Sequence, residues 1–309
     1  MKINNLLIHL QNSVDAFSLK PHHADRIRKI LPDARIIITE STRDFLEKLP
    51  EADCALVWSF KAEWYENAPK LRAIFTPAAG HDWVAEDPAG RVSTYYGKFH
   101  GRIMRESLLS IILYFNRQVG KSLSDQRDKV WGRLGYNESV SLFSQKVLII
   151  GYGSLGQSMA ELLKAFGAGV VGVRQNAGGF EGRRNVDRII SFDRLEEELP
   201  HADHVVILLP GGAETDDIIS ERHFKQMKQG ACLYNLGRGN CYREEDLLNA
   251  LNNGPLAKAG LDVFAEEPLP PTSPLWEHPN VLITPHSSAI SREYIDLFIQ
   301  EWIERIRDF

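Results

Sequence analysis

Short apolar runs alternate with amphipathic segments through the first hundred residues of the chain. The runs are five or six residues long, as strands are, and the segments between them repeat apolar residues at helical spacing. Strands that alternate with helices are typical of βαβ units, which build a parallel sheet. The predicted strands are residues 6–10, 34–39, 54–59 and 72–77, and the predicted helices are residues 23–31 and 42–49.

A second alternation follows a long apolar segment. Residues 101–122 keep a helical pattern throughout, which predicts one helix that could join two domains. After it, six apolar runs with helical segments between most of them fit a doubly wound nucleotide-binding domain. These predicted strands are residues 146–150, 168–173, 204–209, 231–236, 257–264 and 280–285.

The end of the chain has the pattern of one more amphipathic helix, over residues 291–309. This helix is free to return to the first domain. We therefore expect a discontinuous substrate domain of residues 1–104 and 287–309, and a dinucleotide-binding domain of residues 105–286. The predicted fold class is α/β, with two doubly wound parallel-sheet domains, one Rossmann-type and one flavodoxin-like.

Composition narrows the class of protein. The 309 residues carry a net charge of −5 with no basic block, which argues against a nucleic-acid partner. Cys54, Cys232 and Cys241 fit neither a metal-binding spacing nor a disulfide framework, so we expect no metal site and a reducing cytoplasm. The first residues do not resemble a secretory signal, and no apolar stretch approaches the length of a membrane span.

Gly151, Gly153 and Gly156 form a G-x-G-x-x-G motif in the right context. The apolar run KVLII leads into it, and a helical segment over residues 154–167 follows. In such a motif the glycines allow a tight turn, close approach of the backbone to a pyrophosphate, and close packing of helix on strand. The alternative is a glycine-rich turn without a ligand.

The residue after the next strand bears on the choice of cofactor. NAD enzymes usually place an acidic residue there for the ribose hydroxyl, whereas an arginine accommodates the 2′-phosphate of NADP. This chain has Arg174, followed by Gln175 and Asn176. We therefore expect NADP, with Arg183 or Arg184 as possible helpers. If Arg174 is only a solvated loop residue, NAD remains possible.

Three later segments place charged side chains just after predicted strands, where ligands bind in open α/β sheets. They contain Arg238 between two glycines, then Asp262 followed by the acidic pair Glu266 and Glu267, and His286 behind a proline. An arginine fork binds a carboxylate at two points. Histidine titrates near neutral pH and suits proton transfer. Each of these residues alone could be structural.

Taken together and in order, these motifs resemble the D-isomer-specific 2-hydroxyacid dehydrogenase family, and within it the branch of the glyoxylate/hydroxypyruvate reductases. The resemblance covers nearly the whole chain. Besides the glycine motif, it includes TPAAGHDW (76–83), HGRIMRE (100–106), LLPGGAET (208–215), NLGRGN (235–240), LDVFAEEPLP (261–270) and TPHSS (284–288).

The resemblance implies three catalytic residues. Arg238 would bind the substrate carboxylate and polarise the ketone. His286 would be the general acid in reduction, paired with Glu267, because a carboxylate beside an imidazolium favours its charged form. Glu266 is the rival for this role, but the acid of the family immediately precedes the proline.

The resemblance also implies contacts with cofactor and substrate. Asp262 would lie near the nicotinamide carboxamide, and the first domain would offer backbone N–H groups to the substrate carboxylate. His81 and the Ser287–Ser288 pair depart from the apolar residues usual in the family. The implied cofactor residues are Gly151, Gly153, Ser154, Leu155, Gly156, Arg174, Gln175, Pro210, Thr215, Leu236, Gly237, Asp262 and Ser288, and the implied substrate residues are Ala79, Gly80, His81 and Arg238.

The expected function is reduction of a small 2-oxo acid, such as glyoxylate or hydroxypyruvate, to the D-2-hydroxy acid with NADPH. Relatives imply a homodimer, and the composition predicts a cytoplasmic protein without membrane or nucleic-acid partners. The apolar helix over residues 101–122 fits either the dimer interface or the core. A nucleotide-sensing binding protein and a phosphite dehydrogenase are the alternatives. Formate oxidation is disfavoured, since formate enzymes of the family have glutamine in place of Glu267.

Overall fold

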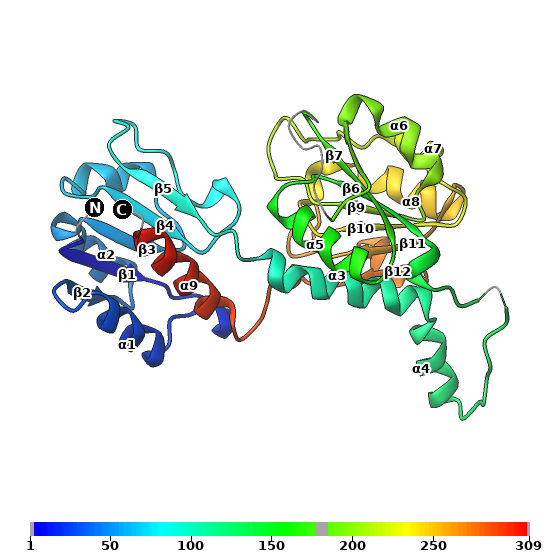
Figure 1. Ribbon diagram of the computed structural model, residues 1–309, viewed down its shortest axis with the longest axis horizontal. Coiled ribbons are helices and arrows are strands. Elements are labelled where there is room, and N and C mark those ends of the chain that lie inside the picture. The colour runs from blue at the N-terminus through cyan, green and yellow to red at the C-terminus, as the bar shows by residue number, and fades with distance from the viewer. Residues whose placement is uncertain (1–2, 137, 177–184, 308–309) are drawn as a thin grey trace. The chain divides into compact units, whose positions relative to one another are not determined.

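The computed structural model describes residues 3–136, 138–176 and 185–307. The chain divides into two compact units, shown in Figure 1. Unit 1 comprises Met1–His100 and Ile290–Phe309, and unit 2 comprises Gly101–Ala289. Unit 1 is therefore discontinuous in sequence, because the last helix belongs to it.

Unit 1 contains a five-stranded sheet in the order β2-β1-β3-β4-β5, with all neighbouring strands parallel. This is the flavodoxin-like order, so the predicted fold class is confirmed for this unit. Its central strands β3 and β4 are fully buried, as their continuous apolar sequences require. The strands are β1 (Asn5–His9), β2 (Arg35–Ile38), β3 (Cys54–Val57), β4 (Ala73–Thr76) and β5 (Ser93–Tyr96).

The α-helices described for this unit are α1 (Pro21–Ile30), α2 (Thr42–Lys48) and α9 (Tyr294–Arg307). α2 buries Phe45 in a core with residues of β1, β3 and β4. α9 packs against α1 and buries one continuous stripe, as its amphipathic pattern predicts. The stripe consists of Tyr294, Ile295, Phe298, Ile299, Trp302 and Ile303.

Unit 2 contains a seven-stranded parallel sheet in the order β12-β11-β10-β9-β6-β7-β8. Six of these strands have the Rossmann order, so the predicted dinucleotide-binding fold is confirmed. The strands are β6 (Lys146–Ile150), β7 (Gly169–Arg174), β8 (Arg188–Ser191), β9 (His204–Ile207), β10 (Ala231–Asn235), β11 (Leu256–Leu261) and β12 (Val281–Ile283).

Helices cover both faces of the second sheet. On one face, α3 (Gly101–Asn116) and α5 (Ser154–Ala165) pack together and against the strands. On the other face lie α6 (Leu195–Glu198), α7 (Glu221–Gln226) and α8 (Glu244–Asn252). The apolar side of α3 is buried in this core, so core packing accounts for its composition. Among the described helices, none is both long and apolar enough to cross a membrane.

The prediction of one helix over residues 101–122 was wrong. α3 ends at Asn116, and a separate helix, α4 (Val119–Arg127), begins after Gln118. Gln118 has a left-handed φ of 52°, which interrupts the helical ladder of hydrogen bonds. Lys258 of β11 donates to the carbonyl of Phe115 and to the side chain of Gln118, and so satisfies groups at the end of α3.

Strands β5 and β8 were not predicted from the sequence. Each is the last strand at one edge of its sheet. Each has only four residues, STYY and RIIS, and begins with an exposed residue; the other residues are only partly buried, apart from the buried Ile190. A strand that is covered only partly gives a weak apolar signal, which is why both were overlooked.

Candidate active site

The glycine motif connects the end of β6 to the start of α5. Gly151 has a φ of 97°, and a Cβ there would lie 2.7 Å from the carbonyl oxygen of Leu208. A Cβ at Gly156 would lie 3.0 Å from the carbonyl oxygen of Gly151. Both positions therefore need glycine to bring the turn, α5 and β9 together.

Gly153 differs from the other two glycines, because nothing lies within 4 Å of the position of its Cβ. It is the N-cap of α5, and Ser154 and Leu155 begin the helix. The free N–H groups and the dipole of a helix N-terminus favour an anion in such open space. The residues present thus fit the pyrophosphate of a dinucleotide.

Arg174 is the last residue of β7 and is half-buried, whereas Gln175 and Asn176 are exposed. The turn of the glycine motif is hydrogen-bonded to the end of β7, since the N–H groups of Gly151 and Tyr152 both donate to the carbonyl of Val173. Arg174 therefore lies beside the motif, and residues 174–176 contain no carboxylate. The predicted helpers Arg183 and Arg184 lie outside the described residues.

The loops after β9 and β10 are packed against each other. A Cβ at Gly237 would lie 2.5 Å from the carbonyl oxygen of Leu209, so the loops meet backbone to backbone. The Thr215 hydroxyl donates to the carbonyl of Pro210, and Asn240 donates to the Thr215 hydroxyl. Pro210, Thr215, Leu236 and Gly237 are therefore brought together.

Arg238 is half-buried in the loop after β10. Its carbonyl accepts from Asn235, a fully buried residue whose other side-chain atom accepts from the N–H of Gly237. Its side chain donates to the carbonyl of Gly237 and passes Gly211, where a Cβ would lie 3.3 Å from Arg238 Cγ. Asn235 was not predicted as a site residue, although a polar residue at the end of the apolar strand β10 is a signal that the sequence contains.

Gly239 links the loop of Arg238 to the loop that carries the acidic residues. A Cβ at Gly239 would lie 1.9 Å from the carbonyl carbon of Phe264, so only glycine fits there. The N–H of Phe264 in turn donates to Oε1 of Glu267 at 2.9 Å. The loop of Arg238 is thus in direct contact with the loop that positions Glu267.

Glu267 and His286 form a hydrogen-bonded pair. Nδ1 of His286 lies 2.8 Å from Oε2 of Glu267. Because the carboxylate accepts a hydrogen bond from Nδ1–H, the other ring nitrogen, Nε2, is the one that could exchange a proton with a substrate. The histidine side chain is 49% exposed and therefore accessible. Glu266, the rival considered from the sequence, is exposed and makes no such bond in the structure.

Asp262 holds the loop that carries His286. Its side chain is fully buried and accepts from the hydroxyl of Thr284 at 2.5 Å and from the N–H groups of Ser287 and Ser288. Its carbonyl accepts from the N–H of His286. The carboxylate thus organises the turn between β12 and the end of unit 2. Its role beside a nicotinamide carboxamide stays a prediction.

An apolar pocket of about 390 Å³ adjoins the His286–Glu267 pair. Phe264, Leu269, Trp276 and Ile283 are among its lining residues. Arg238 is not among its described lining residues.

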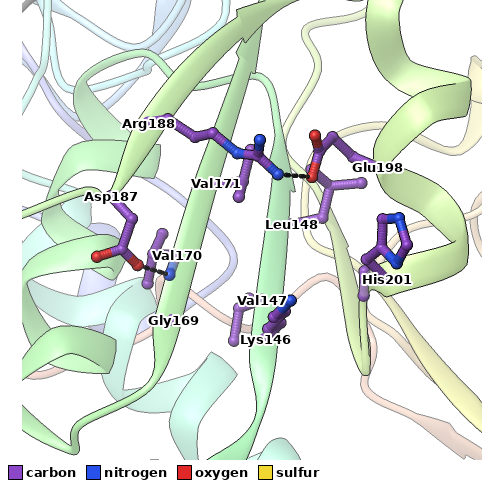
Figure 2. Close-up of a pocket in the computed structure, with 11 residues that line it drawn as sticks. Lys146, Val147, Leu148, Gly169, Val170, Val171, Asp187, Arg188, Glu198 and His201 are labelled. Carbon is purple, nitrogen blue, oxygen red and sulfur yellow. Dashed lines mark hydrogen bonds and ion pairs between the residues drawn. The ribbon is translucent and has the colours of Figure 1, made fainter.

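Figure 2 shows a different pocket, of about 260 Å³, at the amino-terminal ends of strands in the sheet of unit 2. The first residues of β6, β7 and β8 line it, and Arg188 of β8 forms an ion pair there with the buried Glu198. Ligands of doubly wound sheets bind at the carboxyl ends of the strands. None of the predicted site residues is among its described lining residues, so we assign it no part in the site.

The predicted substrate residues of the first domain lie in unit 1. Ala79, Gly80 and His81 follow β4, at the carboxyl end of that strand. His81 is exposed, and its ring stacks on Tyr96 with ring centroids 4.1 Å apart. Their contact with a substrate carboxylate stays a prediction.

His22, His23 and Asp296 form a cluster in unit 1 with ligand atoms within 4.8 Å of one another. Nδ1 of His23 accepts from the N–H of Lys20, so in the neutral ring Nε2 carries the proton and points it toward Asp296. A protonated nitrogen cannot ligate a metal. We therefore interpret the cluster as a contact between α1 and α9.

Comparison with known proteins shows the family to which the chain is similar. The sequence model of one family, described as D-isomer specific 2-hydroxyacid dehydrogenase, NAD binding domain, matches residues 109–288. A glyoxylate/hydroxypyruvate reductase A of Serratia proteamaculans is 34% identical over 252 residues, which are 78% of this chain and 78% of the relative.

Solved structures match the chain over nearly its full length. A D-isomer specific 2-hydroxyacid dehydrogenase family protein of Aeromonas salmonicida has a TM-score of 0.81 and 32% identity, over 99% of this chain and 96% of its own. An NADPH-dependent glyoxylate/hydroxypyruvate reductase of Sinorhizobium meliloti, solved with NADP and sulfate, has a TM-score of 0.77 and 25% identity, over 99% and 95%. The chain therefore belongs to the family of D-isomer-specific 2-hydroxyacid dehydrogenases.

Proposed function

We propose that this protein reduces a small 2-oxo acid, such as glyoxylate or hydroxypyruvate, to the D-2-hydroxy acid with NADPH as the preferred cofactor. The hydrogen bond between His286 and Glu267 carries the proposal. His286, Arg238 and the glycine motif all follow the carboxyl ends of strands in one parallel sheet. A proton donor, a carboxylate binder and a dinucleotide site together suit the reduction of a keto acid.

His286 acts as the general acid. The Glu267 carboxylate orients the imidazole through Nδ1, so that in the imidazolium the proton on Nε2 is the one available to the carbonyl oxygen of the substrate. As that oxygen gains negative charge, Nε2 delivers its proton. In the reverse direction the neutral imidazole accepts the proton from the hydroxyl group.

Arg238 holds the substrate carboxylate and stabilises the developing oxyanion. Its guanidinium is always charged and presents donors in a planar fork. Its side chain is set by the carbonyl of Gly237 and by the space that Gly211 leaves, so little freedom remains to be lost on binding.

The cofactor is held by the glycine motif and by Arg174. When bound, the nicotinamide supplies a hydride to the carbonyl carbon. The N-terminus of α5 receives the pyrophosphate, and Arg174 receives the 2′-phosphate that distinguishes NADP from NAD. The Sinorhizobium meliloti relative was solved with NADP, which supports the same preference here.

Turnover with a panel of substrates tests the proposal. Oxidation of NADPH and NADH is followed by absorbance with glyoxylate, hydroxypyruvate, pyruvate and phenylpyruvate. We expect the fastest turnover with NADPH and the two small acids. Turnover with NADH alone would keep the reaction and contradict the role of Arg174. Cofactor binding without turnover of any acid would contradict the proposal and favour a nucleotide-sensing protein.

We also propose that the protein is a homodimer in the cytoplasm, joined through unit 2. α4 and residues 128–136 form an arm that extends away from the rest of unit 2 (Figure 1), and this arm exposes large apolar side chains. Such exposure on one segment marks an interaction surface, and two-fold homodimers are the commonest assemblies. The free cysteines, all buried, suit a reducing compartment. The exposed apolar residues of the arm are Leu123, Val130, Trp131 and Tyr136. Val140 and Phe143, which are also exposed, lie where the chain has returned to α3 and to the end of α5.

A further inference from the structure

Ser107 of α3 makes a hydrogen bond that its position in a helix does not require. Its hydroxyl donates to the carbonyl oxygen of Ser288 at 2.8 Å, across a sequence separation of 181 residues. Serine in a helix usually bonds back to a carbonyl three or four residues earlier. Two other helical serines of this chain do so, Ser110 to the carbonyl of Ser107 and Ser122 to that of Gln118.

The acceptor of this bond, Ser288, is held from two directions. Its N–H donates to the carboxylate of Asp262, at the end of β11, and its carbonyl accepts from Ser107 on α3. Ser288 is only 5% exposed, so water cannot readily replace either partner. A buried carbonyl without a partner is unfavourable, and the loop would move to avoid it.

Ser288 follows His286 by two residues, so what holds Ser288 also limits the histidine. His286 has a left-handed φ of 48°, a conformation uncommon for residues other than glycine. Such a conformation persists where the surroundings fix it on several sides. Here Asp262 fixes the loop from β11, and Ser107 fixes it from α3.

The position of Ser288 in the chain gives this anchor a further consequence. Unit 2 ends at Ala289, and the chain continues into unit 1 from Ile290. The partners of Ser288, Asp262 and Ser107, both belong to unit 2, so Ser288 is fixed within that unit one residue before the unit ends.

We propose that Ser107 is a positioning residue, which holds the carbonyl of Ser288 and thereby keeps His286 in the orientation that pairs with Glu267. This inference rests on the proposed role of His286 as general acid. In this proposal Ser107 acts through Ser288 and is assigned no contact with substrate or cofactor. It sets the fraction of molecules in which the imidazole is ready to donate its proton.

The test compares Ser107→Ala with Ser110→Ala, a matched control on the same helix whose hydroxyl bonds only locally. With NADPH and glyoxylate, we expect Ser107→Ala to lower kcat by about fivefold to tenfold, the effect of losing one hydrogen bond to a buried carbonyl. The KM for NADPH should not change. In a profile of kcat against pH, the decline toward high pH should begin at a lower pH in Ser107→Ala than in the wild type, since fewer molecules keep the His286–Glu267 pair. Ser110→Ala should match the wild type.

Ser107→Thr and Ser107→Val separate the hydroxyl from the shape of the side chain, because they differ only in that group. We expect threonine to restore kcat and the pH profile, and valine not to do so. The pair also replaces the alanine variant if that protein fails to fold. Equal kcat and equal pH profiles in Ser107→Val and Ser107→Thr would overturn the proposal.

Failure of the proposed function is recognised separately. If the wild type turns over no 2-oxo acid, the general-acid role is wrong, and the imidazole resonances of His286 are then titrated by NMR. A changed titration midpoint in Ser107→Ala, with none in Ser110→Ala, would support the positioning of His286 by Ser107. Identical midpoints in both variants and the wild type would overturn it.

Discussion

Nδ1 of His286 lies 2.8 Å from Oε2 of Glu267, and the second oxygen of that carboxylate accepts from the N–H of Phe264. The glutamate is thus held by its own loop while it holds the histidine. One ring nitrogen is occupied, and the other is free to exchange a proton with a substrate.

Replacement of Glu267 by glutamine tests this relationship. An amide carries no charge and no longer favours the imidazolium, so we expect kcat for reduction to fall by about 10- to 100-fold, as for loss of much of a general acid's contribution. The pH at which the rate declines should move to lower values, measured as kcat against pH. Glu266→Gln, one residue away, should behave like the wild type. An unchanged pH profile in Glu267→Gln would argue against the pair.

Arg238→Ala should remove most of the activity. We expect kcat/KM for glyoxylate to fall by about 1000-fold, because both the carboxylate contact and the stabilisation of the oxyanion are lost. Arg243→Ala, at the exposed N-cap of α8, is the control and should keep normal kinetics. Near-normal turnover in the Arg238 variant would show that another residue binds the carboxylate.

Arg174→Gln tests the choice of cofactor. Loss of a charge-assisted contact to the 2′-phosphate should raise the KM for NADPH by about 10- to 100-fold and leave that for NADH nearly unchanged. Arg194→Gln, an exposed arginine paired with Glu197, is the matched control. Equal changes for both cofactors would mean that Arg174 does not discriminate between them.

Trp131 is 90% exposed on the arm formed by α4 and residues 128–136. If the arm is the dimer interface, Trp131→Glu should bury an unpaired charge there and yield a monomer by size-exclusion chromatography with light scattering. Trp83→Glu, an exposed tryptophan of unit 1, should leave the assembly unchanged. A wild-type protein that is already monomeric at micromolar concentration would refute the assembly itself.

His204 makes the stability of unit 2 sensitive to acid. The side chain is fully buried between Tyr234 and Gln145, and burial lowers the pKa of His204 from 6.5 to about 4. The unfolded chain therefore binds a proton that the folded state does not. The contribution of His204 to the free energy of unfolding is fully present above pH 6.5. It decreases as pH falls toward 4, by about 3 kcal/mol in total.

Urea unfolding between pH 8 and pH 4.5 would measure this loss. Burial also lowers the pKa of His23 and of His223, so both contribute in the same direction. In His204→Gln the free energy of unfolding should vary less with pH between 6.5 and 4. The same slope in wild type and variant would place the sensitivity elsewhere.

Several elements of the fold followed from local pattern alone. β6, the glycine motif and α5 occur within one short stretch, and the periodicity of residues 146–165 was sufficient to predict them. The amphipathic last helix was predicted in the same way. The edge strands β5 and β8 were not, because half-covered strands lack a continuous apolar run. The break between α3 and α4 at Gln118 was not predicted, because a left-handed backbone conformation at one residue does not change the spacing of apolar residues along the chain.

The sequence by itself determined the kinds of chemical group available and the order in which the strands deliver them. Arg238, Glu267 and His286 each follow a strand, and a parallel sheet brings such strand ends to one edge. Only the tertiary structure decided which groups meet. Three contacts join residues from different loops and helices. They are the pairing of His286 with Glu267 rather than Glu266, the hydrogen bonds that Asp262 accepts from Thr284, Ser287 and Ser288, and the bond from Ser107 to Ser288. Such contacts depend on distances in space, which periodicity along the chain does not encode.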